Sequence, residues 1–260
     1  MFGSAFTPDG STVYFCETDP EIKHIQIMES HNIKGKWAKP KPASFSPGLY
    51  RDIDPFITPD GKQLFFESNR PPEGTGEAGK TFDIYVLDRR SDGRWSKPRP
   101  MHGVNSQSNE VFATAARNGN LYFSSNREGG KGKVDIYVAK KTAKGYQEPK
   151  GLVGINTPDN DDNPLIAPDE SFLIFARHVS EHNDLFISFR DGDHWSAGES
   201  IGASVNTDDD EYAPAFSPDQ KLLYFTRTRF ENGKRVKAGT IYSVRISALK
   251  LKRNKDAANK

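Results

Sequence analysis

The chain has 260 residues, and its 36 basic and 35 acidic side chains leave a formal net charge of +1. This balance excludes a global electrostatic attraction to nucleic acid or to an anionic membrane surface, so neither partner is expected. The single cysteine excludes a disulfide framework. No apolar run approaches the roughly 20 residues that cross a bilayer, so no membrane insertion is expected.

One turn motif returns along the whole chain. It reads FTPDG at 6–10, and near-copies follow at intervals of about 50 residues. Pro presets φ, while Asp, Asn and Gly accept turn conformations, and an aromatic-rich run such as QLFF follows each turn. The copies are anchored at Asp9, Asp60, Asn118, Asp169 and Asp219.

Each copy predicts a unit of four strands, and the second unit is the clearest. Strand A precedes the turn at 54–58, strand B follows it at 62–68, strand C covers 82–88, and strand D contains a tryptophan at 93–98. These runs are short, aromatic-rich and bounded by turn residues, which favours strands over helices. The strand D aromatics, expected to pack between outer strands, are Trp37, Trp95, Tyr146 and Trp195.

Four-stranded units of about 50 residues in series are typical of β-propeller blades. We therefore predict an all-β propeller with five visible four-stranded blades, forming a single domain over 1–249. A charged, disordered tail is expected over 250–260. Because the last copy lacks an aromatic strand D, a six-bladed parent with one blade missing is the alternative.

Acidic residues recur at a fixed distance before four of the five turns. They fall at the start of strand A, which is innermost in a propeller, so we expect them around one mouth of the central channel. Converging carboxylates need cations, Arg partners or water. The predicted binding set comprises Asp52, Glu110, Asp161 and Glu211, with Asp54 and Asn163 two positions further along strand A.

Three roles stay open for these acids. In the first, each acid caps its own loop or pairs with a basic residue of the next blade. In the second, the four ring acids hold Ca²⁺ or Mg²⁺, which prefer oxygen ligands, although no cofactor is required. In the third, two carboxyls act in glycoside hydrolysis, which needs them roughly 5–10 Å apart in distinct environments.

A second recurrence places arginines at the end of strand B and aspartates at the start of strand C. A bidentate Arg–Asp pair would tie these two strands together within a blade. The alternative is an anion site formed by the same arginines together with Arg227. The predicted ties are Arg70–Asp83, Arg127–Asp135 and Arg177–Asp184.

The turns FTPDG, ITPDG and FSPDQ, the runs LFFESNR and LYFSSNR, and the repeated DIYV resemble the TolB-like (WD-like) β-propeller repeats of bacterial proteins. The resemblance covers nearly the whole chain. It implies a periplasmic or secreted, non-catalytic binding or scaffold module whose ligand, a protein segment or a glycan, engages the channel mouth and top loops. Carbohydrate-active relatives imply the alternative, a glycoside hydrolase or lyase that uses channel carboxylates. We expect a monomer.

Overall fold

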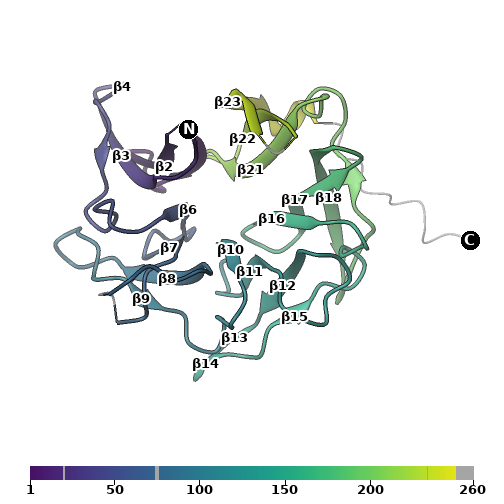
Figure 1. Cartoon of the computed structure of the whole chain (residues 1–260), viewed down its shortest axis with the longest axis horizontal. Coiled ribbons are helices and arrows are strands. Elements are labelled where there is room, and N and C mark those ends of the chain that lie inside the picture. Colours follow the sequence, from purple (N-terminus) through teal and green to yellow (C-terminus); the bar gives the residue numbers. More distant parts are fainter. Residues whose placement is uncertain (20, 74–75, 233, 250–260) are drawn as a thin grey trace, which may run out of the picture.

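The computed structural model describes residues 1–19, 21–73, 76–232 and 234–249. Its strands form five antiparallel sheets around a central opening, the five blades of a β-propeller (Figure 1). The predicted fold class is confirmed. The first and last blades meet directly, because β1 (Phe2–Phe6) contacts β21 (Asp210–Phe216), so the ring closes with five blades. The predicted tail at 250–260 lies outside the described residues.

Each blade is built from an inner strand A, a strand B and a strand C that pair in sequence order. Blade 1 contains β1, β2 (Thr12–Thr18) and β3 (Ile25–Ile33), and blade 2 contains β6 (Asp52–Ile57), β7 (Gln63–Ser68) and β8 (Asp83–Asp88). Blade 3 contains β10 (Glu110–Ala115), β11 (Leu121–Ser125) and β12 (Asp135–Ala139), and blade 4 contains β16 (Asp161–Ile166), β17 (Phe172–Val179) and β18 (His182–Asp191). Blade 5 contains β21, β22 (Leu222–Glu231) and β23 (Lys234–Arg245), which the 3-10 helix η1 (Ile246–Ala248) follows.

The outermost strand lies later in the sequence than predicted. The strand D aromatics belong to short hairpin extensions of strand C, and the strand that completes each of blades 1 to 4 is a two-residue strand after them. Among the described residues, the sheet of blade 5 has three strands. The extension strands are β4 (Lys36–Trp37), β13 (Lys141–Thr142), β14 (Gly145–Tyr146) and β19 (His194–Trp195); the outer strands are β5 (Lys41–Pro42), β9 (Arg99–Pro100), β15 (Lys150–Gly151) and β20 (Glu199–Ser200).

The repeated turn joins strands A and B, as its sequence predicts. The Asp9 carboxylate accepts hydrogen bonds from the Thr7 hydroxyl at 2.6 Å and the Ser11 amide at 3.0 Å, and the residue after it adopts a positive φ. Gly10 meets this requirement at +66°, since glycine has no Cβ to clash. Glu170 adopts the same conformation at +58° in blade 4, where its carboxylate is anchored by side chains of the neighbouring blade.

The core lies between blades. Each of four apolar clusters joins residues of two neighbouring blades, for example Tyr14 with Phe66 and Ile174 with Phe225. A fully buried side chain of this size contributes roughly 1.5–3 kcal/mol, so one blade alone cannot bury enough surface. Trp95, Tyr146 and Trp195 pack against these clusters as expected, whereas Trp37 is 46% exposed. The Trp95 indole donates a hydrogen bond to the Tyr14 hydroxyl of blade 1 at 2.9 Å.

Candidate functional site

The four predicted ring acids are fully buried, and each pairs with an arginine on strand B of its own blade. None of them lines the central cavity. These four residues therefore do not form the expected ring of carboxylates at a channel mouth. The pairs are Asp52–Arg70 at 2.6 Å, Glu110–Arg127 at 2.9 Å, Asp161–Arg177 at 2.6 Å and Glu211–Arg227 at 2.6 Å.

Each pair also fixes the loop that enters from the preceding blade, and blade 3 shows the arrangement. Arg127 donates to the Val104 carbonyl at 2.9 Å, while Glu110 accepts hydrogen bonds from the Ser106 amide at 2.7 Å and the Ser106 hydroxyl at 2.6 Å. The acid, the arginine and the loop thus lock two neighbouring blades together. The equivalent sets are Asp161, Arg177, Ile155 and Thr157 in blade 4, and Glu211, Arg227, Val205 and Thr207 in blade 5.

The predicted ties between strands B and C are not formed, because each arginine turns to strand A instead. Asp83, Asp135 and Asp184 each keep one buried carboxylate oxygen that accepts no hydrogen bond from the described residues. Burial, with the charge of Glu110 as the second cause, raises the pKa of Asp83 to about 6. Within the part of the chain that the structure describes, no group of three or more His, Cys, Asp or Glu side chains could hold a metal ion.

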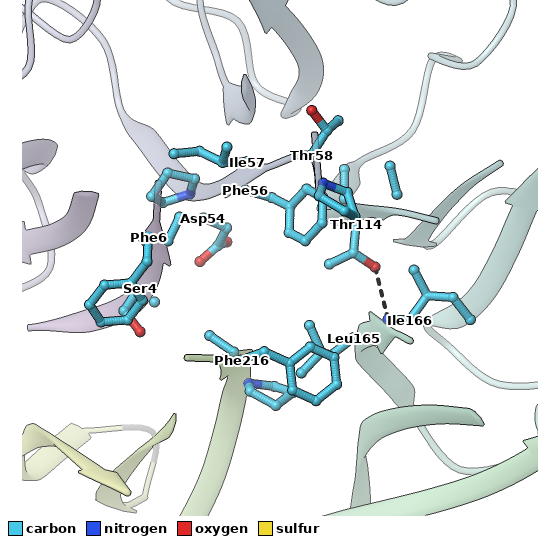
Figure 2. Close-up of a pocket in the computed structure, with 18 of the residues that line it drawn as sticks. Ser4, Phe6, Asp54, Phe56, Ile57, Thr58, Thr114, Leu165, Ile166 and Phe216 are labelled. Atoms are coloured by element: carbon cyan, nitrogen blue, oxygen red, sulfur yellow. Dashed lines mark hydrogen bonds between the residues drawn. The ribbon is translucent and has the colours of Figure 1, made fainter. Parts of the chain in front are cut away.

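The central cavity is the main hollow at the axis of the ring, with a volume of about 170 Å³ (Figure 2). All five inner strands line it. Its walls are largely apolar, with Phe6, Phe56, Leu165 and Phe216 facing the opening. The cavity extends to the turns between strands A and B, which we call the turn rim; the prolines that line it there are Pro8, Pro59, Pro168 and Pro218.

At its other end the cavity reaches a layer of five equivalent residues, one per inner strand, where the pairing of strands A and B shifts register. All five adopt a left-handed backbone with φ between +49° and +56°. Such bulges re-aim side chains and leave amides unpaired. We call this set the bulge layer: Gly3, Asp54, Phe112, Asn163 and Ala213. Asp54 and Asn163 are therefore the two predicted binding residues that do line the cavity.

Amides freed at the bulge layer bond to side chains of strand B in the preceding blade. The position that supplies the acceptor holds Cys16, Glu67 and Ser124 in blades 1 to 3. In blade 4 the equivalent residue is Ala176, which has no acceptor, and the Asn163 side chain replaces it by accepting from the Ala213 amide at 2.9 Å.

These contacts leave a cluster of acids beside the cavity. Burial, and then the charge of Asp162, raises the pKa of Asp54 well above its ordinary value. Burial, and then the charge of Asp54, does the same to the pKa of Glu67. Burial raises the pKa of Asp162 to about 6. Neither Asp54 oxygen accepts a hydrogen bond from the described residues, and Glu67 Oε2 accepts none either.

Glu67 was not among the predicted site residues. Its only signal in the sequence is a lone acid inside the apolar run QLFFES, at a position that holds Cys16 and Ser124 in the flanking blades. Burial raises the pKa of the Cys16 thiol well above its ordinary value, so Cys16 is a thiol rather than a thiolate nucleophile at neutral pH.

No protein-family model matches the chain, and no curated protein matches it significantly. Among solved structures, a protein described as TolB from Agrobacterium tumefaciens has a TM-score of 0.59 at 15% identity, covering 94% of this chain and 76% of that one. An α-L-arabinofuranosidase from Lactobacillus brevis gives 0.59 at 12% identity, covering 93% and 90%. A thermostable family-43 glycoside hydrolase gives 0.61 at 12% identity, covering 94% and 88%.

At these identities the likeness shows the β-propeller fold alone, and the fold is shared by proteins of different function. In the described residues, no helix is long and apolar enough to cross a membrane.

Proposed function

We propose that the chain is a non-catalytic, TolB-like binding propeller that takes an extended protein segment into its central cavity. One observation carries the proposal. The repeated acids and arginines are bound to one another as links between blades, whereas the cavity at the axis is walled by all five blades and is largely apolar. Concave, mostly apolar hollows with a few polar groups are where proteins bind ligands.

The chemistry of the wall supports a protein segment over a glycan. Three of the hydroxyls that line the cavity already donate within the protein: Thr58 to Asp60 at 2.7 Å, Thr114 to the Pro164 carbonyl at 2.9 Å, and Ser217 to Asp219 at 2.6 Å. A sugar in this cavity would leave several hydroxyls without partners, at about 1–3 kcal/mol each. Apolar side chains of a peptide match phenylalanine and proline walls without that cost.

A glycoside hydrolase or lyase is the second candidate, and the acid cluster at Asp54, Glu67 and Asp162 favours it. Raised carboxyl pKa values are what a general acid needs. However, Glu67 is fully buried, and neither Glu67 nor Asp162 lines the central cavity. Assays with aryl glycosides and polysaccharides test this candidate. Turnover that disappears in Asp162→Asn would replace the binding proposal with the enzymatic one.

The binding proposal is tested by selecting short random peptides on the protein and re-testing them on a variant with a filled cavity. Ser4→Phe is suitable, because Ser4 lines the cavity and a phenylalanine ring there would occupy it. Asp92→Asn, at an exposed outer turn of blade 2, is the control. Peptides that bind the wild type and the control but not Ser4→Phe support the cavity as the site. Peptides that bind all three proteins equally would refute it.

Two further expectations belong to this proposal, and the metal binding that the sequence left open also has a direct test. A monomer is tested by light scattering, and a periplasmic or secreted location by fractionation of the source cells. Binding of Ca²⁺ or Mg²⁺ is tested by thermal unfolding in EDTA and then with each ion, because a ligand at about 100 times its Kd stabilises the native state by roughly 2.7 kcal/mol. An unchanged midpoint would exclude binding of these ions.

A further inference from the structure

Asp54 is the one acidic side chain that lines the central cavity among the described residues. It is 6% exposed, its carboxylate points into the cavity in Figure 2, and neither of its oxygens accepts a hydrogen bond from the described residues. Buried carboxyls are nearly always paired or hydrogen-bonded, because an isolated buried charge is costly. A carboxyl that has no hydrogen-bond partner at the end of an apolar cavity is a candidate for recognising a ligand.

The titratable groups that face Asp54 add negative charge, and the nearby positive groups, the Met1 ammonium beside Cys16 and Arg235 beside Tyr212, donate no hydrogen bond to it. Cys16 of β2, Glu67 of β7, Asp162 of β16 and Tyr212 of β21 are its titratable neighbours. Each is neutral or anionic in any state, so none of them can neutralise an ionised Asp54 from within the protein. The missing partner must therefore be a proton or a positive group that enters the cavity.

The turn rim carries charges of both signs, because Lys62 and Lys221 lie beside its aspartates and Arg117 itself lines the cavity. Hydrogen bonds within the turns lower the pKa of every aspartate that anchors them, and that of Asp9 falls to about 2, so these residues are ionised at neutral pH. The rim lysines Lys62 and Lys221 are each 80% exposed in their side chains and lie 3.5–3.8 Å from those aspartates. The rim therefore gives a positive group no one-sided attraction, and within the described residues the carboxylate that such a group meets in the cavity lining is that of Asp54.

We propose that the central cavity binds a primary ammonium group on an unbranched apolar stem, the chemistry of a lysine side chain, with the ammonium at Asp54 and the stem against Phe6, Phe56 and Phe216. A metal ion does not fit, because the described acids form no ligand group and the walls are apolar. The stretch from Asp54 to Pro59 spans roughly 16 Å at the rise of a strand, so the lysine must be carried on an extended, protruding segment.

This inference rests on the cavity being the binding site, and it adds the chemical identity of the group that anchors the ligand. The probes are n-butylamine, its neutral isostere n-butanol, and a lysine-containing peptide whose lysine side chain is either free and charged or acetylated at Nζ and neutral. Affinity is measured by calorimetry and by NMR titration. The variants are Asp54→Asn at the end of the cavity, Asp60→Asn as the same change at the rim, and Ser4→Phe as the filled cavity.

We expect n-butylamine and the charged peptide to bind the wild type, and to lose roughly tenfold or more in affinity in Asp54→Asn, as for the loss of a charged hydrogen bond. Binding to Asp60→Asn should change by less than about twofold, since exposed charges are strongly screened. The isostere and the acetylated peptide should bind roughly tenfold more weakly than the charged probes. Thermal unfolding confirms that each variant is folded.

The outcomes separate this inference from the proposed function. If Ser4→Phe abolishes binding while Asp54→Asn leaves it unchanged, the cavity binds ligands without the ammonium contact, and only the inference is overturned. If neutral and charged probes bind equally, the same conclusion holds. If no probe binds and peptide selection also fails at the cavity, both the inference and the proposed function are refuted.

Discussion

Removing Arg177 should destabilise the propeller more than most single changes to its surface. Its Nε lies 2.6 Å from Asp161 Oδ1, it donates to the Ile155 carbonyl at 2.9 Å, and its side chain is 13% exposed against 0% for that of Asp161. Arg177→Met removes the guanidinium, whose central carbon lies 4.8 Å from the centroid of the Phe186 ring, and leaves Asp161 as a buried, unpaired charge. Breaking a buried pair from one side costs about 3–5 kcal/mol.

At about 2–4 °C per kcal/mol for a large domain, the loss in Arg177→Met corresponds to a fall of roughly 6–20 °C in the midpoint of thermal unfolding. Urea unfolding gives the free energy directly. The matched control is Asp184→Asn, which changes the acid on strand C that lies opposite Arg177 without bonding to it. We expect this control not to destabilise the protein at neutral pH, because burial raises the pKa of Asp184 and makes its charged form unfavourable in the folded state. A loss in Asp184→Asn as large as that in Arg177→Met would refute the assignment of the pair.

The loss should also depend on pH, in a direction that the pair determines. Burial already raises the pKa of Asp161 in the wild type, and removing the arginine takes away the main group that lowers it. A carboxyl whose pKa is raised in the folded state loses stability as pH rises from its ordinary value through the raised one. The deficit of Arg177→Met should therefore be largest at about pH 7 and smaller at about pH 4. A deficit that grows on acidification would contradict an unpaired Asp161.

Three other changes test separate contacts by thermal and urea unfolding. Asp83→Asn should raise the midpoint of thermal unfolding at about pH 7 and leave it nearly unchanged at about pH 3. The reason is that the pKa of Asp83 is raised to about 6, so its charged form becomes unfavourable in the folded state as pH rises from about 4 to about 6. A lower midpoint at neutral pH would contradict this. Asn163→Ala should cost about 1–3 kcal/mol by leaving the buried Ala213 amide without an acceptor, and faster hydrogen exchange at that amide is the specific check. Trp95→Phe should cost about 0.5–1.5 kcal/mol more in the wild type than in Tyr14→Phe, because only the wild type has the bond from the indole to the Tyr14 hydroxyl.

The blade repeat could be predicted from the sequence because its cause is local. Asp9 caps its own turn through neighbours only two residues away, and the following position needs a positive φ, so the letters Pro-Asp-Gly carry the turn with them. The outer strand was misplaced for the opposite reason. Whether 93–98 or Arg99–Pro100 pairs along β8 depends on register across the sheet, which the tryptophan in the earlier segment does not determine.

The partner of each arginine could not be chosen from the sequence either. Arg177 lies opposite both Asp161 on β16 and Asp184 on β18, and either acid satisfies the recurrence. The loop from the preceding blade decides between them. It brings the Ile155 carbonyl to the guanidinium and the Thr157 amide and hydroxyl to Asp161, so that acid is buried among donors. This loop reaches the pair only after two blades have docked, so the local sequence around Arg177 does not predict the contact.

The bulge layer explains why two acids of one predicted ring have different environments. Counting by the period of two along a regular strand puts Asp52 and Asp54 on the same face. The left-handed backbone at Asp54 breaks this alternation, so Asp52 turns into its blade toward Arg70 while Asp54 turns into the cavity. Glycine, aspartate and asparagine accept that conformation readily, but Phe112 and Ala213 adopt it at about 1–2 kcal/mol each. The bulge recurs in all five inner strands, and at Asp54 it turns one member of a repeated pattern into an unpaired carboxyl at the centre.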